Sequence, residues 1–359
     1  MEQDILKIIE YGIMAPSVDN NQPWYFKTDK KSIYVYLDED RKKTGEFLHT
    51  ENALDLICLG ALLENIKIAS SHLGYLPEII NFPDKKYKNL IARVNLSINK
   101  KKASHPFYLF IPQRATNRTR YQNCRINETI KNTTLDIAKQ NNANLYWVDD
   151  RASIKKIANA ASLFDFVLWN NNEKRNDLLK WLRLDEKEAY LTKDGLFLET
   201  LGLNKFKKIL FNFFAKISRT SILARWIIGI NSCFHQRGLI KASSAVLILT
   251  MPNASDIDYL KGGQILQNIW LYLTSEKIAC QPIAGALYLL MYEFFPEKMG
   301  ELRPWHRKIA KKCFREFSLN SKISENNALI CLLRIGCAEI PKIKSLRRPI
   351  KEVISPLKK

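Results

Sequence analysis

The sequence lacks several features that define common protein classes. None of its 359 residues belongs to an uncharged run of 18 or more, so it offers no candidate membrane span. The first 14 residues begin acidic and end without a small-residue cleavage site, so we expect no secretory signal. The five histidines are scattered and form no set of metal ligands with the cysteines. We therefore expect no metal site and no Ser–His or Cys–His catalytic arrangement.

The seven cysteines show no CxxC spacing, which argues against a zinc site and a disulfide framework. Cys58, Cys280 and Cys331 lie within apolar runs, where a reduced thiol behaves as a small hydrophobic side chain. Disulfides are rare in reducing compartments, so this pattern predicts reduced, buried thiols and a cytoplasmic location.

The composition is that of a folded protein with a large positive charge. Hydrophobic residues make up 46% and aromatic residues 11%, which is enough to form a core and excludes disorder as the main state. The 56 Lys and Arg against 36 Asp and Glu give a net charge of +20. The lysines are spread along the chain, and no zinc-finger or RNP-type motif accompanies them, so we expect no nucleic-acid partner.

Apolar periodicity and breaker residues predict the main elements. Amphipathic spacing predicts a helix over residues 2–14, and a long helix over 51–73 is closed by Gly74 at the position of a left-handed cap. Strands are predicted over residues 24–27, 32–38 and 90–98. The continuous apolar runs 244–251 and 328–336 predict two further strands that are covered on both faces.

Parts of the first half are echoed later in the chain. Residues 145–151 (LYWVDDR) are similar to residues 35–41 (VYLDEDR), and residues 263–281 are similar to residues 60–76, each beginning with Gly. These echoes predict a degenerate internal duplication, with residues 184–243 inserted in the second copy. The alternative is that any two helix–strand units look alike at this level of similarity.

Four stretches have the residue types that hold a phosphorylated planar cofactor. In an extended segment, Arg114, Thr116 and Arg118 point to one side, and two guanidinium groups with a hydroxyl suit a phosphate. Arg347 and Arg348 form a second basic pair. Two further stretches are residues 15–24, rich in short amides and hydroxyls, and the small-residue run 281–285.

In this order the stretches resemble the nitroreductase family of FMN-dependent oxidoreductases. The segments that carry the resemblance are APSVDNNQPWYF, RATNR, Gly263 to Gly285, and LLRIGCAEIPKIKSLRRPIKEVI. The resemblance implies an α+β fold with a central mixed, mostly antiparallel sheet flanked by helices. Because the APS motif precedes the phosphate motif, the order is similar to the duplicated, fused Acg-type branch. The expected halves of this intramolecular pseudo-dimer are residues 1–110 and 111–359.

The resemblance also assigns residues to FMN. Arg114, Thr116, Arg118 and Arg347 are implied at the phosphate. Arg348 is included as an alternative to Arg347, because the alignment in this segment can shift by one position. The ring and ribityl chain are implied to meet the first half, and flavin N5 and O4 the backbone after the interface helix. The residues implied are Pro16, Ser17 and Asn20 in the first half and Pro282, Ile283, Ala284 and Gly285 in the second. Ala284 replaces the family's usual Glu.

The implied activity is hydride transfer from NAD(P)H through the flavin to a quinone or nitroaromatic acceptor, with no side chain as catalyst. The alternative is an FMN store without turnover, in which the insertion 184–243 is a lid. Residues 205–228 of the insertion are basic and amphipathic, so they form either a helix packed on the body or a peripheral membrane contact. The sequence leaves open whether the chain is a monomer or a homodimer.

Overall fold

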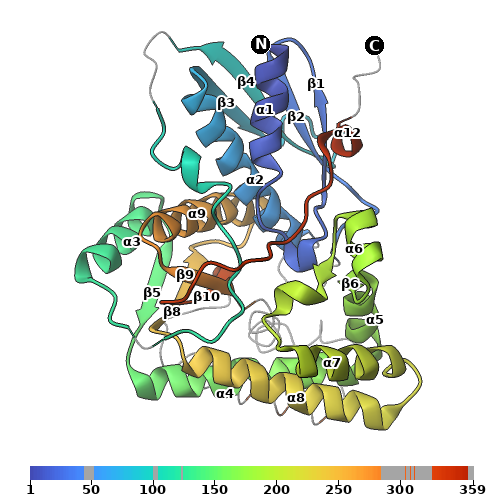
Figure 1. Ribbon diagram of the computed structural model, residues 1–359. Helices are drawn as coiled ribbons and strands as arrows, with labels where there is room; N and C mark the ends of the chain where they lie inside the picture. Colours follow the sequence, from blue (N-terminus) through green and yellow to red (C-terminus); the bar gives the residue numbers. More distant parts are fainter. Residues whose placement is uncertain are drawn as a thin grey trace.

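The computed structural model describes residues 1–43, 52–99, 104–122, 124–283, 304, 308, 311 and 326–354. Two four-stranded antiparallel sheets, with helices between and around them, make the fold α+β as predicted. Figure 1 shows them stacked, with the paired helices α2 (Ala53–His72) and α9 (Asp256–Ser275) between them. The sequence led us to expect one central sheet, whereas the described residues form two four-stranded sheets, each packed on its own long helix, and a short two-stranded parallel pair.

The first sheet contains the earlier part of the chain. Its strands lie in the order β1-β2-β4-β3, every neighbouring pair is antiparallel, and α1 (Glu2–Gly12) packs on α2. The predicted strand at 90–98 is confirmed, and Gly74 after α2 has φ 86°, a conformation that favours glycine. The strand bounds are β1 Trp24–Thr28, β2 Ser32–Leu37, β3 Tyr75–Asn81 and β4 Leu90–Ile98.

The second sheet is covered on both faces. Its order is β5-β8-β10-β9, and every residue of β8 and β10 is buried, as their apolar runs predict. Alternate residues of β8 belong to two different cores: Leu247 lies in the core that α9 shares, and Ile248 in the core of α4 (Arg151–Asn170). The strand bounds are β5 Asn144–Val148, β8 Ala245–Met251, β9 Ala279–Pro282 and β10 Ala328–Gly336.

The two sheets have the same topology. In each, the two middle strands in the sheet are the second and fourth along the chain, and one long helix precedes the third strand. The predicted echo between residues 60–76 and 263–281 therefore joins equivalent helices. The echo between residues 35–41 and 145–151 does not, because β2 is a middle strand and β5 is an edge strand. The strand echo was wrong, since short strand–turn segments resemble one another whatever their place in a sheet.

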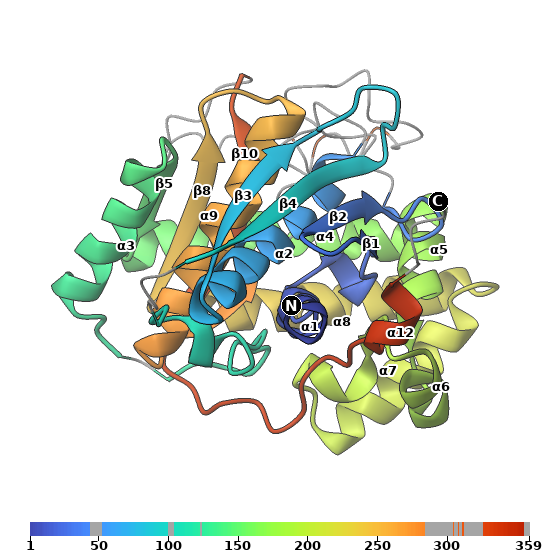
Figure 2. The same ribbon diagram turned by 90° about the horizontal axis from the view of Figure 1, so that it is seen from above.

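The equivalent helices α2 and α9 touch through glycine. A Cβ added to Gly60 would lie 2.0 Å from the carbonyl oxygen of Leu260, and one added to Gly263 would lie 2.1 Å from that of Ile57. Each backbone thus approaches the other at a place where only glycine fits. Figure 2 gives a second view of these helices.

Polar side chains at the same crossing also make reciprocal contacts between α2 and α9. The Gln267 amide donates to Asn65 Oδ1 at 2.7 Å, and the Asn268 amide donates to Glu64 Oε1 at 3.2 Å. Glu64 and Gln267 hold corresponding positions in the two helices, as do Asn65 and Asn268. The contact therefore has the form of an isologous interface, in which the same surface serves both partners.

The insertion at 184–243 contributes helices on the side of the second sheet away from α9 (Figure 1). Its last helix, α8 (Ile222–Lys241), packs along α4, and α7 (Lys205–Ile217) packs on α8. Helix α3 and several short elements lie between the first sheet and α7 in the sequence. They are α3 Glu128–Gln140, α5 Asn172–Trp181, β6 Leu182–Arg183, α6 Glu186–Thr192, β7 Leu196–Phe197 and the 3-10 turn Leu198–Leu201.

The last described segment crosses from the second sheet back to the first. After β10 it runs over the surface to α12 (Ile350–Val353), beside α1 and β1 (Figure 1). Val353 is buried, and Ile354 pairs with Phe26 of β1. This C-terminal arm, residues 337–354, is rich in polar and basic residues, yet its end contributes to the first core.

One disulfide contradicts the expectation of reduced thiols. Cys124 and Cys337 are joined, with their Cα atoms 6.0 Å apart, while Cys58, Cys280 and Cys331 are free and buried as predicted. A β-bridge between Gln122 and Cys337 brings the pair together. Because 213 residues separate the two cysteines, their spacing does not reveal the pairing. Among the described residues, no helix has the length and apolar character that a membrane crossing requires.

Candidate functional site

Most of the predicted cofactor residues surround one small cavity of about 160 Å³. Its walls come from the loop after α1, the extended segment before α3, the C-terminal arm and Thr200 of the insertion. Segments from both ends of the chain therefore meet here. The predicted residues that line it are Pro16, Ser17, Asn20, Arg114, Thr116, Arg118 and Arg347.

Arg114 is the most enclosed of the three arginines in this cavity. Its side chain is buried, its guanidinium lies 4.7 Å from the ring centre of Trp270, and Nη2 donates to the Met14 carbonyl at 2.8 Å. Burial, together with the nearby positive charge of Arg347, lowers its pKa to about 9. Its Nε is buried and has no hydrogen-bond partner.

Arg118 and Arg347 complete a cluster of three guanidinium groups. Arg118 donates to the Thr200 carbonyl at 3.3 Å, and Arg347 donates to Asn20 Oδ1 at 2.8 Å and to the Ala15 carbonyl at 3.0 Å. Burial lowers the pKa of each to about 10. The Nε of Arg347 is also buried without a partner.

No carboxylate lines this cavity, and no ion pair joins its three arginines to an acid in the part of the chain that the structure describes. Asp19 acts on Arg118 through space, but its carboxylate is paired with Lys43 at 3.0 Å. Buried charges are normally paired because removing them from water is costly. Lys344, whose pKa is lowered by burial and by Arg114, adds a fourth cation to the lining.

The loop after α1 is held in an unusual conformation. Asp19, Asn20 and Gln22 have φ values of 49°, 57° and 53°, in the region that residues other than glycine rarely adopt. Asn20 donates to the Leu346 carbonyl at 3.0 Å and accepts from Arg347, so the arm fixes the loop. The Ser17 hydroxyl oxygen accepts from the backbone N–H of Gln22 at 3.0 Å. Such strain is typical of functional loops.

Three other predicted residues, Arg348, Pro282 and Ile283, do not line this cavity. Arg348 is 3.9 Å from Asp38 and 3.8 Å from Glu352, so its charge is balanced by acids and not turned to the cavity. Pro282 pairs with β10, and Ile283 is buried in the core shared with α4. Ala284 and Gly285 lie outside the described residues.

Arg334 organises the site, and sequence reasoning missed it. It is fully buried in β10, its guanidinium lies 3.8 Å from the ring centre of Tyr121, and it donates to the carbonyls of Asn117 and Thr119 at 3.1 and 2.8 Å. It therefore holds the segment that carries Arg118. An arginine within an otherwise apolar, fully buried strand was the available signal.

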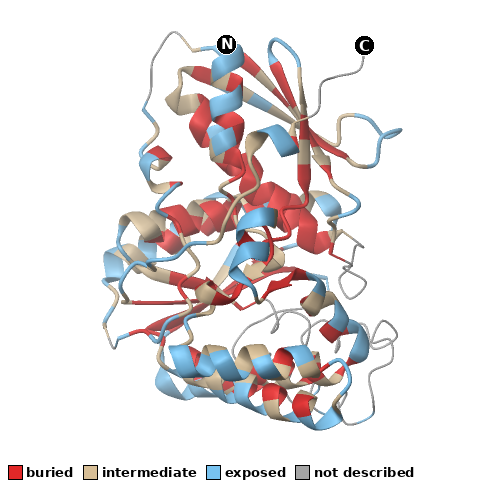
Figure 3. Cartoon of the chain, turned by 45° about the vertical axis from the view of Figure 1, so that its right-hand side comes forward, coloured by how far each residue is buried: buried red, intermediate tan, exposed pale blue. Residues whose placement is uncertain are grey.

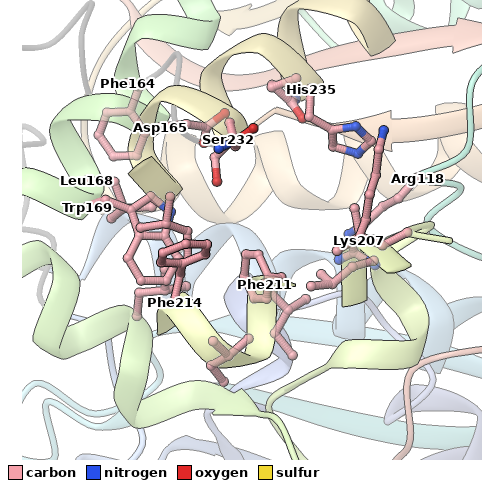
Figure 4. Close-up of a pocket in the computed structure, with 18 of the residues that line it drawn as sticks. Arg118, Phe164, Asp165, Leu168, Trp169, Lys207, Phe211, Phe214, Ser232 and His235 are labelled. Atoms are coloured by element: carbon pink, nitrogen blue, oxygen red, sulfur yellow. The ribbon is translucent and has the colours of Figure 1, made fainter. Parts of the chain in front are cut away.

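A larger cavity of about 560 Å³ adjoins the small one, because Arg118 lines both. Its walls come mainly from α4, α7 and α8 and are mostly apolar. Figure 4 shows Arg118, Lys207 and His235 gathered at one end and Trp169 and Phe214 at the other. The volume is in the range of small-molecule sites.

Besides Arg118, two of the titratable groups that line this larger cavity have shifted pKa values. Burial raises the pKa of Asp165 to about 7, and burial with the nearby Lys207 lowers the pKa of His235 below its ordinary value. Both groups are therefore driven toward their neutral forms. Gln281, which precedes the predicted backbone contacts of the flavin, also lines the cavity and accepts from Arg334 at 2.6 Å.

Comparison with known proteins gives one curated relative and a set of solved structures, and no family model matches the chain. The relative is "Uncharacterized protein MT1398" of Mycobacterium tuberculosis, which is 19% identical over 341 residues, 95% of this chain and 47% of the relative. The chain thus spans about half the length of the curated relative it matches.

Three nitroreductases are among the solved structures to which the chain is similar. The FMN- and NADPH-dependent nitroreductase NfnB from Sphigopyxis sp. strain HMH has a TM-score of 0.39 and 13% identity, covering 69% of this chain and 97% of that one. An FMN-bound nitroreductase from Desulfitobacterium hafniense has a TM-score of 0.37 and 13% identity, covering 70% and 98%. One from Bacteroides fragilis, also with FMN, has a TM-score of 0.35 and 10% identity, covering 68% and 94%. With TM-scores below 0.5, none of these likenesses bears on the assignments below.

Proposed function

We propose that the protein binds FMN between two nitroreductase-like halves and acts as an NAD(P)H-dependent oxidoreductase. The observation that carries this proposal is the cluster of Arg114, Arg118 and Arg347, three enclosed cations without a carboxylate partner. The buried Nε atoms of Arg114 and Arg347 have no hydrogen-bond partner, and burial lowers the pKa of all three guanidinium groups, so the cluster fits a site for an anion. A phosphate monoester offers the negative charge and acceptor oxygens that would satisfy them.

The residues around the small cavity fit the phosphate end of such a cofactor. Arg114 and Arg347 would hold the phosphate from the α1 side, Arg118 would hold it from the larger cavity, and the hydroxyls of Thr116 and Ser17 would donate to it. The cavity volume of about 160 Å³ equals roughly five waters at about 30 Å³ each, which suits this group and not a whole nucleotide.

The larger cavity is where the flavin ring would lie. Arg118 lines both spaces, so a molecule with a phosphate at one end and a planar ring at the other would pass this side chain. Bound FMN would supply the hydride chemistry at its ring. The apolar walls from α4, α7 and α8 would exclude water and orient a flat quinone or nitroaromatic acceptor, while Asp165 holds a proton at its carboxyl near neutral pH.

The duplicated architecture supports the same proposal. The reciprocal contacts at the α2–α9 crossing, through Gly60, Gly263 and the amides beside them, are those expected of a homodimer interface reproduced within one chain. The small cavity combines residues that precede α2 with residues that follow it. We infer that one chain takes the place of two subunits, with the division near residue 110.

The alternative is an FMN store without turnover. One observation favours it: Leu201, Lys207 and Phe211 of the insertion form part of the larger cavity's wall, as a lid would. An absorbance spectrum of the purified protein tests both functions, because each requires FMN that is released on denaturation. A colourless protein that cannot be loaded with FMN would exclude both.

Reduction of the bound flavin separates the two. For a reductase, NADH or NADPH bleaches the flavin absorbance under anaerobic conditions, and a quinone restores it. For a store, neither nicotinamide bleaches the flavin while dithionite does. Failure of the nicotinamides with a flavin that dithionite reduces would refute the oxidoreductase proposal and leave FMN binding intact.

A further inference from the structure

The helical hairpin of α7 and α8 carries a row of exposed apolar side chains on each helix. On α7 the exposed residues recur at i, i+3, i+4 and i+7, and on α8 at intervals of about four, so each row occupies one helix face. Nine large apolar side chains are involved, each between 40% and 71% exposed. They are Phe206, Ile209, Leu210, Phe213, Ile222, Leu223, Trp226, Ile230 and Phe234.

These nine exposed side chains are concentrated in a short part of the chain, between Phe206 and Phe234. Figure 3 shows the central layers largely buried and the helices at the bottom of the view, the region of α4, α7 and α8, mostly exposed or intermediate. Isolated exposed hydrophobic residues are ordinary, but contiguous apolar patches usually mark an interaction surface. The packing of α7 on α8 brings the two rows together on one structural unit.

The charge of this unit identifies the kind of partner. No Asp or Glu occurs between Glu199 and Asp256, and the same stretch contains eight Lys and Arg residues. Lys205 and Lys216, at the two ends of α7, are exposed on either side of its apolar row. An apolar helix face bordered by lysines is the arrangement by which amphipathic helices lie on anionic lipid surfaces.

We propose that the α7–α8 hairpin docks the protein on an anionic membrane surface, with its apolar side chains in the lipid interface. A second copy of the chain is a poorer partner, because joining two such faces would bring like charges together without an acid to compensate them. The proposal does not depend on FMN. Leu210 and Phe234 belong both to the exposed rows and to the lining of the larger cavity, so docking would place that cavity next to the lipid.

Vesicle co-sedimentation tests the proposal with the full chain. We expect the protein to sediment with phosphatidylcholine vesicles containing phosphatidylglycerol, and to sediment much less with phosphatidylcholine alone. The double variant Phe206→Asp, Phe213→Asp should lower the partition coefficient by about tenfold or more, because two apolar anchors are lost and two negative charges are gained. Ile98→Asp, at a residue that is 73% exposed in the first sheet, is the matched control and should bind like the wild type.

A charge-reversal variant gives a second, independent test. Lys205→Glu with Lys216→Glu keeps the apolar rows and should lose most binding to anionic vesicles, and thermal melting checks that each variant is folded. Three outcomes would overturn the proposal. The first is no sedimentation of the wild type with anionic vesicles, and the second is that the Phe and Lys variants sediment as well as the wild type. The third is a dimer that the Phe206→Asp, Phe213→Asp variant loses while vesicles bind neither protein.

Discussion

Replacing Arg114 with methionine separates the stability of the protein from its affinity for an anion. Methionine keeps an unbranched side chain over the Trp270 ring and removes the charge. The Met14 carbonyl loses one donor, but Arg347 Nη2 lies 3.3 Å from it and remains. The substitution therefore removes a cation from the cavity while leaving its walls in place.

The magnitude follows from the depressed pKa of Arg114. A fall from 12.5 to about 9 corresponds to about 5 kcal/mol of unfavourable free energy for holding the charge in the folded protein, at about 1.36 kcal/mol per pKa unit. The lost hydrogen bond and cation–π contact offset about 3 kcal/mol of this. We expect FMN-free Arg114→Met to be more stable than the FMN-free wild type by about 2 kcal/mol.

Affinity should move in the opposite direction. Hydrogen bonds between charged groups contribute about 1.5–3 kcal/mol each, so losing a two-point guanidinium–phosphate contact should weaken FMN binding by about 100-fold or more. Denaturant unfolding without ligand and fluorescence titration with FMN measure the two effects, and Arg114→Lys should retain part of the affinity. A variant that holds FMN as tightly as the wild type would refute the assignment of Arg114 to the phosphate.

Three further predictions concern the fold. Gly60→Ala should lower the free energy of unfolding by about 3 kcal/mol or more, because its Cβ would lie 2.0 Å from the Leu260 carbonyl oxygen. Gly238→Ala, whose Cβ would have nothing within 4 Å, should leave the free energy of unfolding unchanged or raise it. Equal melting temperatures of the two variants would contradict this prediction. Cys124→Ser should cost about 2–5 kcal/mol in denaturant unfolding, a difference that a reducing agent should abolish. Burial raises the folded-state pKa of Asp165 to about 7 from 3.8, so the folded protein loses stability as the pH rises from about 4 to 8. Asp165→Asn should remove up to about 4 kcal/mol of this pH dependence of the free energy of unfolding. An unchanged pH profile of the variant would exclude this burial effect.

Several elements were readable from local patterns alone. The strand at 90–98 and the strand at 328–336 were predicted with the bounds that the structure gives. The first alternates apolar and polar residues from Val94 to Ile98, and the second is a nearly continuous apolar run, so both patterns favour a strand. The long helix ending before Gly74 was also predicted, since a left-handed residue after a helix favours glycine. In these cases the local preference and the tertiary environment agree.

The cavity was partly readable as well. Arg114, Thr116 and Arg118 alternate along an extended segment, so their convergence follows from strand geometry, and the structure brings them together with Ser17, Asn20 and Arg347. The basic pair in the arm could not be resolved in this way. Arg347 faces the cavity and Arg348 faces Asp38, and neighbouring residues of an irregular segment have no fixed side.

The sequence by itself determined the local structure: where strands and helices form, which faces are apolar, and which short segments carry clustered polar and basic groups. Only the tertiary structure decided how distant segments combine. The pairing of Cys124 with Cys337, the separation of the strands into two sheets, and the role of Arg334 all depend on contacts between residues far apart in the chain. The physical reason is that apolar periodicity is set by neighbouring residues, whereas the enclosure of a charge depends on every segment that packs around it.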